Sequence, residues 1–411
     1  MIDVAVTGIG VFSSIGCDRE TFWSSLVSGT SGIKYIQAFD ASRHKSKIAS
    51  EVISFQPEIF LNFKQARRMA RVSQLASCAA VSAVKDAGLD LNSENPDRVG
   101  CVIGSAAGDY YNLEQQYDRF KEKGPGFVNP LAIPKVIPNM PASNVGITLG
   151  IRGPNLGVST ACSTGAHAIG IALMILRQGF ADIVLAGGAE STITPYVVDG
   201  YSCMGVLSQR NDTPHQASRP FDADRDGFVI GEGAGVLVLE SLSHAKERRA
   251  DVLALVKGFG MTCDAYNVAI PEPEGVAAAS AMVGAIRDAR LNIEDIGHIN
   301  AHGTSTKVND KVEAKAIQAA FAEHGRKVQV TSIKSMIGHT LGAAGAIEAA
   351  ATVLTLQRGI IPPTINHYTT DPECNLNIVA NEARESKIMA AISNSFGFGG
   401  QNGVLVFTRW I

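Results

Sequence analysis

The 411-residue sequence contains seven cysteines, and no two of them form a C-x-x-C pair. An odd number without paired spacing argues against a disulfide framework and a thiolate zinc site, and it favours a reducing compartment. No apolar run reaches the roughly 18 residues of a membrane-spanning helix, and no signal-peptide pattern opens the chain. Neither sign of charge dominates, since the net charge is -3. We therefore expect a cytoplasmic protein that coats neither nucleic acid nor a membrane.

Glycine is abundant, with 41 residues and no short period, which indicates many tight turns and close backbone contacts. Short β-branched runs at 4–7, 99–103 and 183–186 alternate with Ala-rich, helix-like stretches at 72–87 and 166–176. Runs that are apolar throughout are typical of strands buried on both faces. The alternation predicts an α/β fold with buried sheets.

The chain also contains an internal repeat. Three pairs of segments resemble each other and occur in the same order in both halves: 80–109 with 284–310, 157–176 with 329–356, and 227–240 with 395–407. One pair could arise by chance, whereas three collinear pairs indicate a duplicated unit with a junction near residues 245–255. In a duplicated α/β fold, the loops at the strand ends of both halves can meet at one cleft.

The first candidate for chemistry is Cys162, in the segment VSTACSTG. A predicted strand there ends in small residues and leads into an apolar-periodic helix, so we expect Cys162 at the helix N-terminus. Unpaired backbone N–H groups and the positive end of the helix dipole favour a thiolate and lower the thiol pKa. The alternative is a buried, unreactive cysteine, which is the commoner role of this residue type.

Two histidines strengthen the catalytic interpretation. His302 follows a predicted strand in NAHGTST, and His339 lies in KSMIGH at a strand-to-helix junction, five residues after Lys334. A lone histidine is more often structural, but the repeat relates these loops to the cysteine loop. A thiolate, two imidazoles that donate hydrogen bonds and a lysine suit covalent acyl transfer with stabilisation of an enolate.

Five motifs in order resemble one enzyme family: TACSTG, RPFDADRDGFVIGEGAG, NAHGTST, KSMIGHTLGAAGAIE and NSFGFGGQNG. They are similar to the elongating β-ketoacyl-acyl-carrier-protein synthases, and to synthase II more than to synthase I. The resemblance covers essentially the whole chain and implies an α/β, thiolase-like fold, with duplicated βαβαβαββ halves in a five-layer α-β-α-β-α arrangement. The N-terminal half, 1–250, would carry the nucleophilic cysteine, and the C-terminal half, 251–411, the two histidines and the lysine.

The resemblance also implies a reaction, the decarboxylative Claisen condensation of fatty-acid chain elongation. Cys162 would carry the acyl group of this acyltransferase. His302 and His339 would bind the malonyl thioester oxygen as carbon dioxide leaves. Lys334 would hold the electrostatics of the site, with Glu348 as its ion-pair partner.

Other residues take binding roles by the same resemblance. The backbone N–H groups of Cys162 and Phe398 would form the oxyanion hole, and Phe398 would also gate the acyl pocket. Thr304 and Thr306 would bind the phosphopantetheine amides, and Ala107 would line the acyl pocket. The substrates would be carried on the phosphopantetheine of acyl carrier protein, so no enzyme-bound cofactor or metal is expected.

A basic cluster at Lys64, Arg67 and Arg68 stands out in this slightly acidic sequence. It is either a solvated helix start or a docking surface for the acidic carrier protein, and the resemblance favours docking. The family usually forms homodimers, so we expect a homodimer. A heterodimer with a chain-length-factor-like subunit is the alternative.

Several other functions compete with this interpretation. Ala107 stands where the family usually has a bulky aliphatic residue, which keeps a specialised type II polyketide, polyene or very-long-chain pathway open. A degradative thiolase would have a second cysteine in the C-terminal glycine-rich loop, and a chain-length factor would lack Cys162. The segment DADRDG at 222–227 mimics a calcium loop, but Gly233 replaces the bidentate glutamate, so we expect a structural turn.

Overall fold

The computed structural model describes residues 2–53 and 55–411. The strands of its main sheet are β1 (Val4–Phe12), β4 (Val99–Gly104), β5 (Asn155–Leu156), β6 (Ile183–Glu190), β7 (Gly233–Ser241), β8 (Ala254–Cys263), β9 (Ile296–Asn300), β10 (Gln329–Thr331), β12 (Asn377–Ile378), β14 (Ala390–Gly397) and β15 (Gln401–Arg409). Two short strand pairs lie apart from it: β2 (Lys34–Tyr35) with β3 (Ile48–Ala49), and β11 (Ile360–Ile361) with β13 (Arg384–Glu385).

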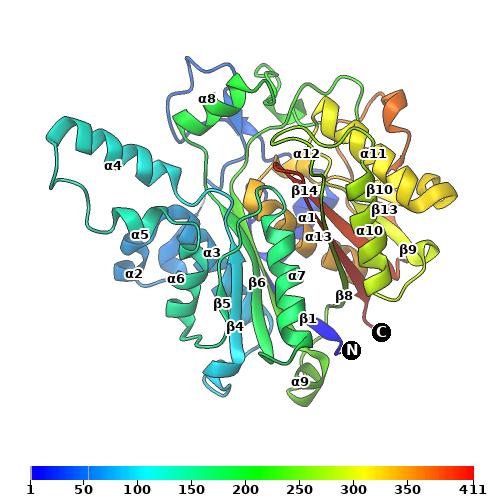
Figure 1. The fold of residues 1–411 in the computed structure, drawn as a ribbon, viewed down its shortest axis with the longest axis horizontal. Helices are drawn as coiled ribbons and strands as arrows, with labels where there is room; N and C mark the ends of the chain where they lie inside the picture. Colours follow the sequence, from blue (N-terminus) through cyan, green and yellow to red (C-terminus); the bar gives the residue numbers. More distant parts are fainter. Residues whose placement is uncertain (1, 54) are drawn as a thin grey trace.

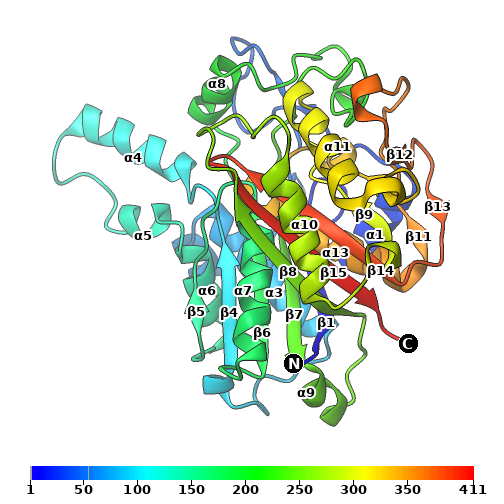
Figure 2. The ribbon, with the colours of Figure 1, turned by 45° about the vertical axis from the view of Figure 1, so that its right-hand side comes forward.

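The helices are α1 (Arg19–Val27), α2 (Phe63–Arg68), α3 (Arg71–Asp86), α4 (Tyr110–Lys123), α5 (Ala132–Val136), α6 (Met140–Leu149), α7 (Thr164–Arg177), α8 (Pro195–Cys203), α9 (Leu242–Glu247), α10 (Val276–Asp288), α11 (Lys307–Phe321), α12 (Lys334–Ile337) and α13 (Ala344–Arg358). α3 and α6 cover one outer face, α10 and α11 cover the other, and α7 and α13 lie between the strands of the two halves (Figures 1 and 2). The five-layer prediction is confirmed.

The two halves of the chain share one strand order. The N-terminal strands lie in the order β5-β4-β6-β7-β1, and the C-terminal strands lie in the order β10-β9-β14-β15-β8, with β12 added at the edge. Each segment of the predicted repeat therefore occupies an equivalent place in the two halves. The halves join where β1 pairs antiparallel with β8, with Val4 opposite Val256. The boundary expected at residue 250 falls between α9 and β8.

Small residues allow two helices to fit between the layers of strands. Residues 344–356 of α13 are all buried. A Cβ added at Gly165 of α7 would lie 2.6 Å from the backbone nitrogen of Ala346 in α13, and one at Gly170 would lie 2.5 Å from the ring of Phe259. Only glycine permits these approaches. The close packing holds the N-terminal end of α7 against the start of α13.

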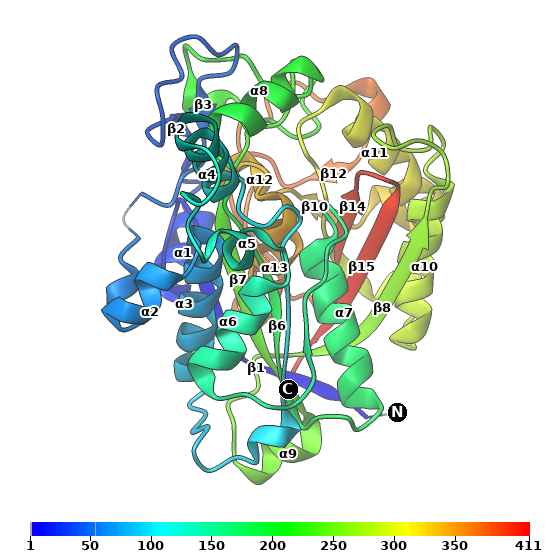
Figure 3. The same cartoon turned by 60° about the vertical axis from the view of Figure 1, so that its left-hand side comes forward.

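α4 and α5 form an arm that extends from the body of the protein (Figures 1 and 2), and Figure 3 looks along this arm toward the body. α4 buries none of its side chains, although it carries apolar ones. The exposed side chains include Tyr111, Leu113, Tyr117 and Phe120. An exposed apolar face of this kind is typical of a surface that contacts another protein. Within the two described ranges, no helix is both long enough and apolar enough to span a membrane.

Candidate active site

Six residues singled out in the sequence line one cavity of about 520 Å³: Cys162, His302, Thr304, Thr306, His339 and Phe398. Apolar and aromatic side chains complete much of the wall, among them Tyr201, Phe228 and Leu341. Cys162 comes from the N-terminal half, whereas the histidines, the threonines and Phe398 come from the C-terminal half. Loops of the two halves thus meet at one cleft, as the duplication predicts.

Cys162 lies in a strained turn directly before α7. The preceding Ala161 has a φ of +48°, in the left-handed region that non-glycine residues rarely adopt. The cysteine is only 8% exposed. Burial raises the pKa of its thiol to about 12, although the charge of Lys334 acts in the opposite direction. The expectation of a lowered thiol pKa is therefore wrong, because desolvation outweighs the stabilisation of the thiolate, and the resting thiol is protonated.

The glycine-rich turn around Phe398 lies against Cys162. Burial raises the pKa of the thiol, and a hydrogen bond from the backbone N–H of Phe398 partly counters that rise. A Cβ added at Gly397 would lie 3.3 Å from the backbone nitrogen of Cys162, so the two segments are in close contact. Gly399 has a φ of +81°, and the rings of Phe398 and Tyr201 have centroids 6.5 Å apart. A backbone donor is thereby directed at the sulfur of Cys162.

The imidazoles of His302 and His339 form a close pair. Their ring centroids lie 5.3 Å apart, and the rings are nearly perpendicular. Burial, reinforced by the charge of Lys334, lowers the pKa of each imidazole well below its usual value. Both rings are therefore neutral at pH 7, and each offers one N–H donor and one acceptor nitrogen. Among the residues described, none bonds to Nδ1 of His339.

Lys334 lies behind His302, outside the lining of the cavity. Its Nζ donates a 2.6 Å hydrogen bond to the carbonyl oxygen of His302 and forms an ion pair with Glu348. Burial raises the pKa of the Glu348 carboxyl, and Lys334 partly offsets this effect. A fully buried ion pair carries a large desolvation cost. Its place beside His302 therefore points to a role in fixing the catalytic loop.

Sequence reasoning missed Glu313, a fully buried carboxylate on α11. Glu313 accepts the backbone N–H groups of His302 and Gly303 at 2.8 and 2.7 Å, and the side-chain amide of Asn394 at 3.2 Å. It therefore fixes the backbone of the histidine loop from the helix that follows. The signal in the sequence was an acidic residue on the apolar face of that helix. Such a face is buried, and a buried carboxylate requires hydrogen-bond donors.

The loop that contains Thr304 and Thr306 is held by an arginine. The hydroxyl oxygens of the two threonines lie 2.9 Å apart. Arg225, which is almost fully buried, donates 3.0 Å hydrogen bonds to the carbonyl oxygens of Thr306 and Lys307 and pairs with Asp371. Both threonines therefore line the cavity from a fixed backbone.

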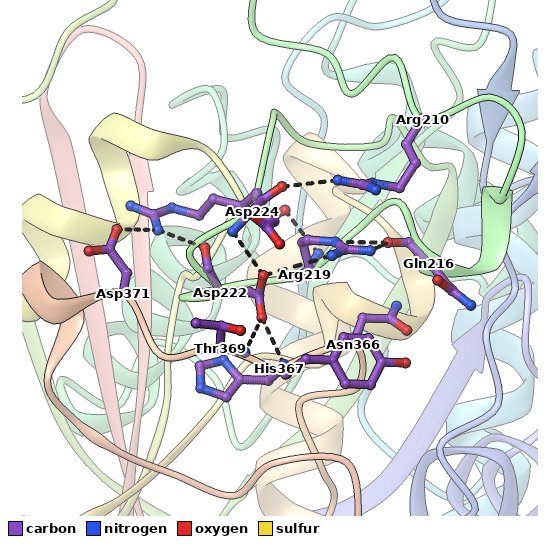
Figure 4. Close-up of polar contacts among 12 residues, drawn as sticks. Arg210, Gln216, Arg219, Asp222, Asp224, Asn366, His367, Thr369 and Asp371 are labelled. Atoms are coloured by element: carbon purple, nitrogen blue, oxygen red, sulfur yellow. Dashed lines mark hydrogen bonds and ion pairs between the residues drawn. The ribbon is translucent and has the colours of Figure 1, made fainter.

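The calcium-like segment at 222–227 is a turn, as expected (Figure 4). The Asp222 carboxylate accepts the backbone N–H groups of Tyr368 and Thr369 at 2.7 and 2.8 Å. The same carboxylate lies 3.7 Å from the guanidinium of Arg219. Its oxygens are thus occupied by protein donors, and the turn connects the two halves of the chain.

The remaining predicted residues lie away from the cavity wall. Ala107 is half-buried in the loop after β4 and is not among the cavity-lining residues. Lys64, Arg67 and Arg68 are exposed on α2, where the Arg67 guanidinium lies over the Phe63 ring, 5.4 Å from its centroid. These residues do not belong to the catalytic cluster of this chain.

Comparison with known proteins identifies the family. Residues 1–245 match the N-terminal domain of β-ketoacyl synthases, and residues 253–368 match their C-terminal domain. The 3-oxoacyl-[acyl-carrier-protein] synthase 2 of Coxiella burnetii is 45% identical over 99% of this chain and 98% of its own length. The synthase 2 of Staphylococcus aureus strain MRSA252 is 44% identical over 100% of this chain and 99% of its own.

Solved structures agree with the sequence matches. The ishigamide ketosynthase/chain length factor has a TM-score of 0.94 at 34% identity, and a type II PKS ketosynthase in complex with its acyl-carrier protein has 0.93 at 32%. Both comparisons cover 100% of each chain. The predicted fold class and enzyme class are confirmed. By sequence and by structure, the chain belongs to the β-ketoacyl synthase family of condensing acyltransferases.

Proposed function

We propose that this protein catalyses decarboxylative Claisen condensation between an acyl group on Cys162 and malonyl acyl carrier protein, in fatty-acid chain elongation. The observation that carries the proposal is the single cavity that contains Cys162 together with His302 and His339. The synthase 2 relatives, at 44 and 45% identity over nearly the full chain, support elongation.

The first step moves the acyl group from the carrier protein to Cys162. The sulfur attacks the thioester carbonyl, its proton passes to a neutral imidazole of the cavity, and the carrier thiol leaves with that proton. Because the thiol pKa is about 12, the proton must leave as the new S–C bond forms. The N–H groups of Cys162 and Phe398 stabilise the negative charge on the carbonyl oxygen.

The second step forms the new carbon–carbon bond. The neutral rings of His302 and His339 each donate an N–H to the malonyl thioester oxygen, where negative charge develops as carbon dioxide leaves. The resulting enolate carbon attacks the acyl carbon on Cys162, and the sulfur departs as a thiolate that takes up one proton from solvent. The products are the β-ketoacyl carrier protein, carbon dioxide and the free cysteine. Lys334 contributes a positive charge and a fixed geometry, without a proton-transfer step.

Carrier-protein binding uses two other groups of residues. Thr304 and Thr306 bind the amides of the phosphopantetheine arm, since both residues line the cavity. The exposed Lys64, Arg67 and Arg68 on α2 attract the acidic surface of the carrier. No other cofactor enters the scheme.

A second copy of the chain covers the arm formed by α4 and α5. α4 buries none of its side chains in the single chain, and the edge strand β5 is exposed. A homodimer would bury both features. Size-exclusion chromatography with light scattering tests this assignment: the purified chain should elute as a dimer, and a monomer at micromolar concentration would contradict it.

A specialised polyketide-like pathway is the second candidate. Two structural neighbours, the ishigamide protein and the type II PKS ketosynthase, favour it. In that pathway the chain would pair with a chain-length-factor-like subunit in place of a second copy.

One experiment separates the candidates. The purified protein is incubated with malonyl carrier protein and with saturated, unsaturated and β-keto acyl carrier proteins, and the intact masses of the products are measured. Extension of saturated and monounsaturated chains by one two-carbon unit is the expected result. Extension of polyenoyl or β-keto chains alone, or activity only with an added partner subunit, would support the second candidate. No extension of any chain would contradict both.

A further inference from the structure

Glu190 is a buried carboxylate that the mechanism above does not use. It ends β6, and its side chain is fully buried. Its Oε1 accepts a hydrogen bond from the Ser105 hydroxyl at 2.9 Å, and its Oε2 accepts the backbone N–H groups of Ala106 and Gly342 at 2.8 and 3.1 Å. Burial raises the pKa of this carboxyl to about 7, and the hydrogen bonds act against that rise.

These partners come from both halves of the chain. Ala106 follows β4 in the N-terminal half, whereas Gly342 lies three residues after His339 in the C-terminal half. A Cβ added at Gly342 would lie 2.5 Å from the backbone nitrogen of Ala106 and 2.5 Å from Oε2 of Glu190. One carboxylate oxygen therefore holds two loops at a fixed separation that only glycine permits.

This junction borders the apolar surroundings of Cys162. Leu341, which directly precedes Gly342, lines the catalytic cavity. Leu341 also belongs to the same apolar cluster as Cys162 and Ile193, and Ile193 follows Glu190 by three residues. One segment that Glu190 binds, at Leu341 and Gly342, and the segment that follows Glu190 itself, at Ile193, thus supply apolar contacts beside Cys162.

We propose that Glu190 is a positioning residue, which fixes the apolar pocket beside Cys162 and thereby determines which acyl chains are extended. The inference rests on the proposed condensation. A long acyl chain on Cys162 extends further along this pocket than a short one, so its binding depends more on the position of Leu341 and Ile193. A carboxylate suits this role because one of its oxygens accepts two backbone N–H groups at once.

The test compares Glu190→Ala and Glu190→Gln with the wild-type protein, using carrier proteins that bear 4-carbon and 12-carbon saturated chains. Alanine leaves two buried N–H donors without a partner, so kcat/KM for the 12-carbon chain should fall about tenfold or more. For the 4-carbon chain the fall should stay below about threefold. In Glu190→Gln, the ratio of kcat/KM for the 12-carbon chain to kcat/KM for the 4-carbon chain should return most of the way to the wild-type value. The amide oxygen can accept both N–H groups while the NH₂ donates to the Ser105 hydroxyl.

Glu240 provides a matched control. It is also fully buried, but it lies at the opposite end of the β6–β7 pair, where it is bound by Arg248 and His244. Glu240→Ala and Glu240→Gln should lower the Tm without changing the ratio of kcat/KM between the two chain lengths.

An equal fall for both chain lengths in Glu190→Ala, or no recovery in Glu190→Gln, would overturn the inference. If Glu190→Ala does not fold, Glu190→Asp takes its place, since the shorter side chain cannot reach both loops. The same selective loss is then expected, and an unchanged ratio overturns the inference. Failure of the wild-type protein to extend any chain would instead contradict the condensation itself.

Discussion

The two halves of this protein have the same strand order and opposite chemical roles. The helix α7, which follows β5, starts beside Cys162, and the equivalent region between β10 and α13 contains Lys334 and His339. The loop after β4 carries only small side chains, whereas its counterpart after β9 carries His302. In the proposed reaction, one half would supply the atom that holds the acyl group, and the other would supply the groups that stabilise the enolate. Duplication thus placed two independent sets of loops at one cavity.

The two halves also fix these loops with the same device. Glu190 accepts backbone N–H groups of the loop after β4, and Glu313 accepts those of the loop after β9. The carboxylates stand on different elements, the end of β6 and the helix α11. Similar loops with different chemistry therefore each depend on a buried anion.

Replacing Cys162 should distinguish most clearly the reaction steps assigned to the two halves. Cys162→Ala removes the acyl acceptor, so condensation should fall by about 1,000-fold or more, while decarboxylation of malonyl carrier protein should change by less than about tenfold. The intact mass of the β-ketoacyl carrier protein measures condensation, and release of carbon dioxide measures decarboxylation. Cys203→Ala, at an exposed cysteine of α8, is the control and should behave as wild type. Condensation that survives in Cys162→Ala would show that another residue carries the acyl group.

Replacing either histidine should have the complementary effect. His302→Ala or His339→Ala removes one donor to the developing oxyanion, so decarboxylation should fall about 100- to 1,000-fold. Acylation of Cys162 should change by less than about tenfold, because the remaining imidazole can still take the thiol proton. Stopped-flow acylation and carbon dioxide release separate the two steps, with the exposed His215→Ala as control. A parallel loss of both steps would argue against this division.

A smaller difference between the halves is the identity of one buried residue at equivalent positions of two strands. The strand β4 carries Cys101 where β9 carries His298, and both side chains are fully buried. Neither ring nitrogen of His298 has a hydrogen-bond partner among the described residues, and burial lowers its pKa to about 3. The unfolded chain has the ordinary pKa of about 6.5, so protonation favours unfolding.

The contribution of His298 to the free energy of unfolding should therefore be fully present above pH 6.5. It should fall as the pH drops from 6.5 toward 3, by at most about 1.4 kcal/mol per pH unit. His298→Leu should flatten the pH dependence of the unfolding free energy, measured by urea denaturation between pH 7 and pH 5. Cys101→Ala is the matched change in the other half, and it should lower stability equally at every pH. An identical pH slope in His298→Leu and the wild type would refute the assignment.

Much of the fold and of the cavity could be predicted from the sequence. The repeat placed equivalent segments in both halves, and the strand-to-helix junctions located Cys162 and His339 correctly. The thiol pKa could not be predicted, because it depends on desolvation by residues distant in the chain. Glu190 and Glu313 were missed for the same reason. A buried carboxylate is recognised by its donors, and Gly342 lies 152 residues from Glu190.

The pairing of β1 has a consequence for how the chain is made. Val4 lies opposite Ser241 on one side and Val256 on the other. During synthesis β1 therefore waits for both neighbours until some 250 further residues have been added, on the order of ten to fifty seconds at ordinary rates of translation. Throughout that interval a strand that is buried along its whole length in the folded protein has two unpaired edges, which expose the nascent chain to wrong strand pairing.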